Sequence, residues 1–139
     1  MTTINAIESK LKAIDKYYAQ LMNYRQHSQE SLKDDATLKG ALERYLYLIC
    51  QSAIDLGEAV IAFKDFYRPT SYADVFETLK EKNIISIELA QKMIKMTGFR
   101  NSIIHDYQKF DFGIAYEVLM SGIDDIKEFE SIIKKYLNL

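Results

Sequence analysis

Apolar residues recur at steps of three and four over most of the chain, which is the spacing that places them on one face of an α-helix. The first stripe consists of Ile4, Ile7, Leu11, Ile14, Tyr18 and Leu21. It predicts an amphipathic helix that ends before the polar stretch 27–31. No segment keeps the alternation of apolar and polar residues that is typical of a strand, so the pattern predicts an all-α protein.

The second stripe is the longest and extends from Leu38 to Phe63. Asp34 or Asp35 is the candidate N-cap of this helix. We expect the helix to end at Arg68-Pro69, because a residue before proline avoids the α region. Small residues on this helix, namely Ala53, Gly57 and Ala59, predict close approach of a neighbouring helix.

Three further helices are predicted after the proline. Ser71 caps a short helix that includes Val75 and Leu79, and Ser86 caps a long helix with Met93 and Met96 in its core stripe. A last long helix starts at Asp111 and is striped by Val118, Leu119, Ile123, Ile126, Phe129, Ile133 and Leu137. Four long helices and a short one form a helical bundle, which we expect to be a single domain over residues 1–139.

The composition fits such a domain. The chain has 139 residues, of which 48% are hydrophobic and 27% charged, and this excludes a disordered chain. No apolar run approaches the length of a membrane span, and no signal peptide is evident. Cys50 is the only cysteine, so no internal disulfide is possible, and a reducing cytoplasmic location is the simplest interpretation.

The net charge of −2 argues against nucleic-acid binding, because domains that bind nucleic acids are usually basic. A nuclease with this composition must concentrate positive charge locally. Pairing two copies of the chain is one way to do so.

The segment with the most chemistry is R-N-x-x-x-H-x-Y, which contains Arg100, Asn101, His105 and Tyr107. The planar fork of an arginine suits a pair of phosphate oxygens, and a histidine exchanges protons near neutral pH. Cleavage of a phosphodiester needs both functions.

Helical geometry complicates this prediction. At about 100° per residue, Arg100 and His105 diverge by roughly 140° on a straight helix, whereas Asn101 and His105 share a face. Either the helix loosens near His105, or the two groups converge from two copies of the chain. The simpler alternative is that Arg100 pairs with an acid on the surface and that His105 only ends the helix.

The motif resembles that of the HEPN superfamily, and in particular that of the HepT toxins, whose signature is R-x4-H-x-Y. The flanking residues agree with this resemblance: Glu43-Arg44 precede an apolar run, 69–76 read P-x-S-Y-x-x-x-F, and Gly98-Phe99 precede the arginine. The chain is therefore identified as a member of the HepT-like HEPN proteins, which implies a HEPN-type bundle and a composite cleft at a homodimer interface.

The resemblance further implies a metal-independent endoribonuclease, the toxin of a type VII toxin–antitoxin pair, that acts on cellular tRNA or mRNA. His105 would serve as general base or acid, and Arg100 would hold the phosphate. Asn101 would bind substrate or orient His105. The RNA itself supplies the attacking hydroxyl, so no metal or cofactor is required.

Tyr107 has a regulatory role by the same resemblance. A cognate MntA-like nucleotidyltransferase antitoxin would attach AMP to its hydroxyl, and the added charge and bulk would block entry of RNA. The alternative is that Tyr107 is one of ten tyrosines and packs at a helix end.

Other polar groups are weaker candidates. Asp55 and Glu58 would support the site by orienting Arg100 or His105, although solvated helix charges are the simpler interpretation. Cys50 lies in an apolar run and reads as a buried thiol. Only two histidines are present, and no Glu-x-x-His pair, so a metal site is not expected.

Two other functions remain open at this stage. One is a noncatalytic HEPN subunit that presents a substrate or nucleotide to a nucleotidyltransferase, which the acidic pI of about 5.7 favours. The other is a plain helical adaptor, which leaves the motif unexplained.

Overall fold

The computed structural model describes residues 3–105 and 110–139, and the described chain is helical without strands. The all-α prediction is thus confirmed. The elements in chain order are α1 (Ile4–Met22), the 3₁₀ turn η1 (Asn23–Gln26), α2 (Gln29–Asp34), α3 (Ala36–Phe63), α4 (Tyr72–Glu81), α5 (Ile87–His105), α6 (Phe112–Glu117), the π-helical turn η3 (Val118–Gly122) and α7 (Ile123–Leu137).

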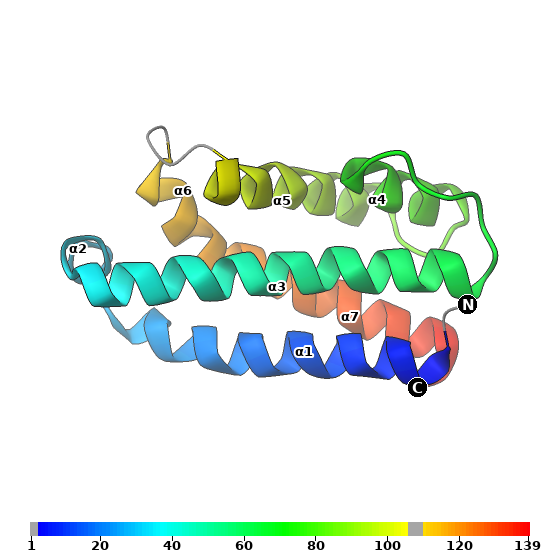
Figure 1. Ribbon diagram of the computed structural model, residues 1–139, viewed down its shortest axis with the longest axis horizontal. Helices are drawn as coiled ribbons and strands as arrows, with labels where there is room; N and C mark the ends of the chain where they lie inside the picture. The colour runs from blue at the N-terminus through cyan, green and yellow to red at the C-terminus, as the bar shows by residue number, and fades with distance from the viewer. Residues whose placement is uncertain (1–2, 106–109) are drawn as a thin grey trace.

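Helix α3 is the centre of the bundle (Figure 1). Helix α1 packs along one side of α3, while α4 and α5 cover another side, and α7 contacts α1, α3 and α5. The start of α1 and the end of α7 lie at the same end of the molecule (Figure 1). The motif helix α5 is therefore held by its neighbours α3, α4 and α7.

The predicted N-caps are confirmed. In each case a short polar side chain accepts a hydrogen bond from a backbone N–H of the first turn, which typically contributes about 1 kcal/mol. The four acceptors and their donors are Asp35 with Thr37 and Leu38, Ser71 with Asp74, Ser86 with Leu89, and Asp111 with Gly113.

Helix α3 ends earlier than predicted, at Phe63 and not at Arg68-Pro69. Asp65 adopts a left-handed conformation with φ 57°. The N–H of Phe66 then donates to the carbonyl of Ile61 at 3.0 Å, which closes the helix with a Schellman motif. The side chain of Phe66 packs against the core, so a hydrophobic contact ends the helix before the proline is reached.

Two other features were not predicted. The polar stretch after α1 contains the short helix α2, which is capped by Ser28 and anchored by the buried Leu32. The last helix is interrupted by η3, a π-helical turn. A π-turn inserts a residue into the helical repeat, and the apolar stripe on both sides of η3 still points inward.

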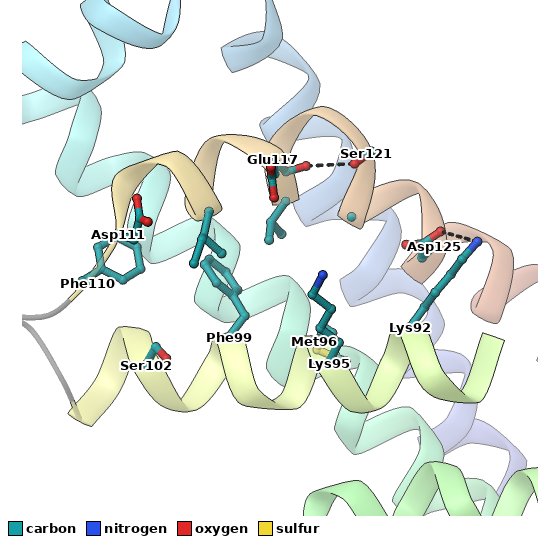
Figure 2. Close-up of a pocket in the computed structure, with 13 residues that line it drawn as sticks. Lys92, Lys95, Met96, Phe99, Ser102, Phe110, Asp111, Glu117, Ser121 and Asp125 are labelled. Carbon is teal, nitrogen blue, oxygen red and sulfur yellow. Dashed lines mark hydrogen bonds and ion pairs between the residues drawn. The ribbon is translucent and has the colours of Figure 1, made fainter. Parts of the chain in front are cut away.

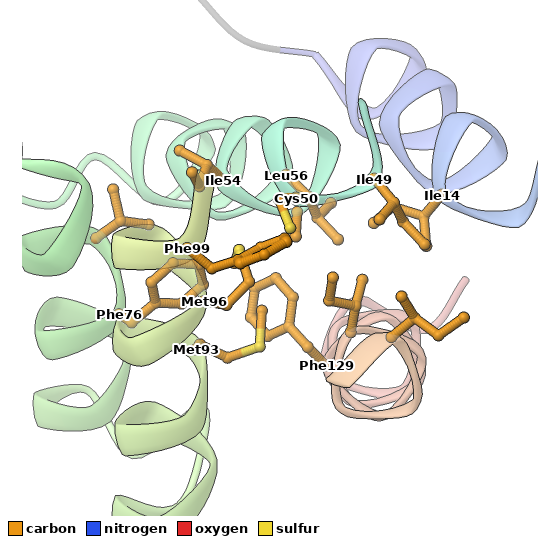
Figure 3. Packing of buried hydrophobic residues seen from close by; sticks show 14 of the residues in the cluster. Ile14, Ile49, Cys50, Ile54, Leu56, Phe76, Met93, Met96, Phe99 and Phe129 are labelled. Carbon is orange, nitrogen blue, oxygen red and sulfur yellow. The ribbon is translucent and has the colours of Figure 1, made fainter. Parts of the chain in front are cut away.

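The core contains residues from every long helix (Figure 3). The rings of Phe76 and Phe129 meet edge to face, with centroids 5.4 Å apart. Gly57 allows α4 to approach α3 closely, because a Cβ at this position would lie 2.5 Å from Val75 Cγ1. This close approach confirms the prediction for Gly57 and places the start of α4 beside α3.

Helix α3 is also long and apolar enough to span a membrane, with a mean hydropathy of 1.5 over its most apolar window. Most of that window, 61%, is buried inside the bundle. We therefore attribute the apolar character of α3 to its central place in the core.

Candidate functional site: the Arg100 cluster

Arg100 projects from α5 toward α3 and is half-buried. Its Nε donates a hydrogen bond to Oε1 of Gln51 at 2.8 Å, and its Nη1 donates to Oδ1 of Asn101 at 3.0 Å. Both acceptors are neutral amides. Among the described residues, no carboxylate lies within 4.0 Å of the guanidinium, which excludes the predicted alternative of a surface ion pair within that part of the chain.

Two tyrosines lie against the same guanidinium. Cζ of Arg100 is 5.3 Å from the ring centroid of Tyr47 on α3 and 5.1 Å from that of Tyr72 on α4. Both distances are within the range of cation–π attraction. The ring of Tyr47 also attracts Arg44, whose Cζ is 5.6 Å from the centroid. The guanidinium is thus restrained by aromatic faces and amides, which leave its formal charge intact.

Asp55 connects to Arg100 through Gln51. Nε2 of Gln51 donates to Oδ1 of Asp55 at 2.8 Å, one turn along α3. The chain of hydrogen bonds therefore extends from Asp55 to Gln51 to Arg100. We call Tyr47, Gln51, Asp55, Tyr72, Arg100 and Asn101 the Arg100 cluster.

Glu58 does not join this cluster in the described structure. It is exposed and has no hydrogen bond or ion pair with Arg100 there. The pKa of Glu58 is raised by partial burial and by the charge of Asp55, and the opposing effects of Arg68 and Lys10 are smaller. Glu58 therefore interacts with the charge of Asp55 one turn away on α3, but it does not contact the guanidinium of Arg100.

His105 is the last residue of α5 and is exposed. The helix is α-helical without a break from Ile87 to His105, so it does not loosen within that range. Arg100 and His105 of one copy consequently keep their divergence of roughly 140°. The hydrogen bond of Asn101 in the described structure is with Arg100, and none with His105 is found there.

Tyr107, the predicted site of modification, and its neighbour Asp106 lie outside the described residues. Cys50, in contrast, is fully buried, and burial raises the pKa of its thiol to about 12. The thiol therefore stays protonated at neutral pH, in agreement with the prediction of a buried, unreactive cysteine.

A cavity of about 390 Å³ lies on a different face of α5, between this helix and the segment α6–η3–α7 (Figure 2). Met96 and Phe99 form part of its apolar wall. Lys92 spans it toward Asp125, with Nζ and Oδ1 3.7 Å apart. Arg100 does not line this cavity. Its neighbour Phe99 faces the cavity, and adjacent residues of an α-helix point about 100° apart.

Sequence reasoning missed Tyr47, Gln51 and Tyr72. A signal was present for two of them: residues 47, 51 and 55 are spaced by four, so they share one face of α3 and interrupt its apolar surface. Tyr72 belongs to the P-x-S-Y-x-x-x-F segment, and nothing in its local sequence indicates a contact with Arg100.

The bundle and its motif define a class of helical proteins with an arginine and a histidine on one helix, and comparison with known proteins identifies the family. Residues 14–133 match the family model described as Ribonuclease HepT-like. The chain therefore belongs to the HepT-like ribonuclease family.

Two relatives are similar over most of the chain. The mRNA nuclease HepT of Shewanella oneidensis is 30% identical over 102 residues, which cover 73% of this chain and 77% of that protein. The tRNA nuclease HepT of Aphanizomenon flos-aquae is 24% identical over 131 residues, which cover 94% and 89% of the two chains.

Solved structures agree with this assignment. The tri-AMPylated HEPN toxin of Shewanella oneidensis, in complex with its MNT antitoxin, is similar with a TM-score of 0.85 and 28% identity over 93% of this chain and 96% of that one. A toxin–antitoxin crystal structure with AMP-PNP is similar with a TM-score of 0.83 and 26% identity, over 92% and 97%.

Proposed function

We propose that this protein is a metal-independent endoribonuclease, the toxin of a type VII toxin–antitoxin pair, which cuts cellular mRNA or tRNA in the cytoplasm. Membership of the HepT-like family supports this proposal, as do relatives that are named as an mRNA nuclease and a tRNA nuclease. The lone, buried Cys50 is consistent with a reducing compartment.

The observation that carries the proposal is the environment of Arg100. Its hydrogen-bond acceptors in the described structure are neutral, so its positive charge is available to an anionic substrate. A phosphodiester is the group in RNA that such a guanidinium recognises, through charge-assisted and often bidentate hydrogen bonds. Charge that develops on the phosphate oxygens during cleavage strengthens these bonds.

His105 supplies the proton transfers. It removes the proton from a ribose 2′-hydroxyl, whose oxygen attacks the adjacent phosphorus, or it protonates the 5′-oxygen that leaves. Its exposed position at the end of α5 is accessible to a large substrate. Asn101 and Asp55 support the reaction by orienting Arg100, directly and through Gln51 respectively.

The working site is composite and belongs to a homodimer. Arg100 and His105 point to different sides of an unbroken helix, so one phosphate meets both groups most readily when the two come from different copies. Dimerisation also doubles the local positive charge of a chain with net charge −2. A strictly monomeric protein at micromolar concentration, measured by light scattering, would contradict this part of the proposal.

Incubation of the purified protein with total RNA in EDTA tests the activity. We expect cleavage by the wild type and its loss in Arg100→Ala and in His105→Ala. Arg68→Ala and His27→Ala are matched controls, since both lie outside the Arg100 cluster, and they should cleave normally. Intact RNA with the unmodified wild type would refute the nuclease.

Tyr107 is the proposed site of AMPylation by a nucleotidyltransferase antitoxin. Support comes from the structure of the similar tri-AMPylated toxin with its MNT antitoxin. Intact-mass spectrometry after incubation with the cognate transferase and ATP should show added AMP on the wild type and none on Tyr107→Phe. The control is Tyr67→Phe. Tyr67 is 95% exposed, so it would receive AMP if exposure alone decided which tyrosine is modified. AMP on Tyr107→Phe would refute the assignment.

A noncatalytic subunit that binds a substrate or nucleotide for a transferase is the second candidate. The acidic pI of about 5.7 favours it. Under this alternative, the RNA stays intact with all variants, and Arg100→Ala weakens binding to the transferase complex instead.

A further inference from the structure

Gln51 uses both ends of its side-chain amide between two charged groups. Oε1 accepts from Nε of Arg100, and Nε2 donates to Asp55, both at 2.8 Å. The side chain is half-buried on α3 and flanked by the buried Cys50 and Ser52. The donor end must face Asp55 because a carboxylate only accepts, so the acceptor end must face Arg100.

We propose that Gln51 is the positioning residue of Arg100: it orients the guanidinium through Nε while keeping the carboxylate of Asp55 one side chain away from it. This inference rests on the proposed function, and it adds a residue and a reason for its chemical type. Gln51 acts through Arg100 and does not touch the substrate.

Gln51 has no charge, so it can hold Arg100 without neutralising its positive charge. A glutamate at this position would form a direct ion pair with Arg100, and such pairs compete with a phosphate for the same donors. A leucine would remove the acceptor for Nε and leave only Asn101 and the two tyrosine rings to restrain the guanidinium. Nη2 of Arg100 has no hydrogen-bond partner among the described residues, so donors remain for the phosphate.

The two tyrosines complete the positioning. Tyr47 and Tyr72 lie within cation–π distance of Arg100 from two different helices. Aromatic rings attract a guanidinium without accepting in-plane hydrogen bonds. The edge of the guanidinium is thus left to the amides and to the substrate.

Three variants separate these contributions. Gln51→Leu removes both hydrogen bonds. Gln51→Glu keeps the acceptor for Arg100, adds charge and places two carboxylates side by side. The double variant Gln51→Glu with Asp55→Asn restores both hydrogen bonds, but it places the negative charge on the residue that touches Arg100. Gln91→Leu, an exposed glutamine on α5, is the matched control.

The kinetic test compares kcat and KM for RNA cleavage, with the folded fraction determined by circular dichroism. We expect Gln51→Leu to lose about 100-fold in kcat/KM, the typical cost of a misplaced catalytic group, while Gln91→Leu keeps wild-type values. Wild-type kcat/KM in Gln51→Leu, per folded molecule, would overturn the positioning role.

The charge test measures binding of a 2′-O-methylated RNA oligonucleotide, which cannot be cleaved, at several salt concentrations. The double variant should bind more weakly, and the slope of log K against log salt should shrink by about 0.7 to 1, because one phosphate contact is lost. Wild-type affinity and slope in the double variant would overturn the requirement for a neutral amide.

A third measurement does not depend on activity. In ¹H–¹⁵N spectra of arginine side chains, the Nε–H of Arg100, assigned with Arg100→Lys, should be protected from exchange in the wild type and exposed in Gln51→Leu. If the wild type fails to cleave RNA while this protection is found, the proposed function fails and the positioning stands. Equal exchange in both proteins would overturn the positioning by itself.

Discussion

Two cations in this bundle, Arg100 and Lys127, have opposite kinds of partners. Arg100 is held by amides and tyrosine rings, and no carboxylate touches it in the described structure. Lys127 on α7 lies between two carboxylates, with Nζ 2.7 Å from Asp15 and 2.8 Å from Glu130. The first cation keeps its charge for a ligand, whereas the charge of the second is satisfied within the fold.

The pKa shifts around Lys127 describe a structural ion pair. Burial raises the pKa of Glu130, whose side chain is 2% exposed, and the neighbouring carboxyl group of Asp15 raises it further. Burial acts to lower the pKa of Lys127, but its hydrogen bonds to Asp15 and Glu130 outweigh this and raise it. This cluster ties α1 to α7. A positive charge alone therefore does not indicate a functional site. Arg100 differs from Lys127 because its partners in the described structure are neutral.

The largest effect that tests this contrast is expected for Arg100→Lys. Lysine keeps the charge but cannot reproduce the Nε hydrogen bond to Gln51 or a bidentate grip on phosphate. We expect kcat for RNA cleavage to fall by about 100- to 1000-fold, as when one donor to a developing oxyanion is removed, with little change in melting temperature. A variant with near-normal kcat would show that charge alone suffices.

Lys127→Met should lower the stability of the protein and leave RNA cleavage unchanged, which is the opposite of the result expected for Arg100→Lys. Removing the lysine leaves Glu130 buried without its main partner, so the free energy of unfolding should fall by about 1 to 3 kcal/mol in urea titrations. This is less than the roughly 3 to 5 kcal/mol for a fully buried pair, because the Lys127 side chain is 34% exposed. Cleavage per folded molecule should be unchanged. Lys12→Met, an exposed lysine on α1, should change neither property.

Glu130→Gln should change how the stability of the Lys127 cluster depends on pH. The folded-state pKa of Glu130 is raised above 4.5, so its stability contribution is fully present below pH 4.5 and is lost as pH rises through the folded-state pKa. Glutamine does not titrate. The melting temperature of Glu130→Gln relative to wild type should therefore increase between pH 4.5 and pH 7. A difference that is constant or falls over this range contradicts the raised pKa.

Arg44→Ala should have the smallest effect. Arg44 is exposed and shares the ring of Tyr47 with Arg100, so it adds positive charge at the edge of the Arg100 cluster. Its removal should raise the KM for RNA by roughly two- to fivefold, in line with an exposed charge pair, and leave kcat unchanged. A loss as large as that of Arg100→Lys would mean that the two arginines act as one catalytic unit.

The sequence by itself determined the long helices and most of their beginnings. Apolar steps of three and four and the caps Asp35, Ser71, Ser86 and Asp111 are local signals, because each cap bonds to a backbone N–H two or three residues ahead. The same holds for the divergence of Arg100 and His105, which follows from their separation on one helix.

Only the tertiary structure decided where α3 ends and what surrounds Arg100. The end of α3 depends on Phe66 packing against the core, a contact that outweighs the more obvious proline signal. Gln51 meets Arg100 across 49 positions of sequence, and Tyr72 reaches it because Gly57 lets α4 approach α3. Such contacts depend on how whole helices pack against one another. The spacing of residues along a single helix shows which of them share a face, but not which partner that face meets.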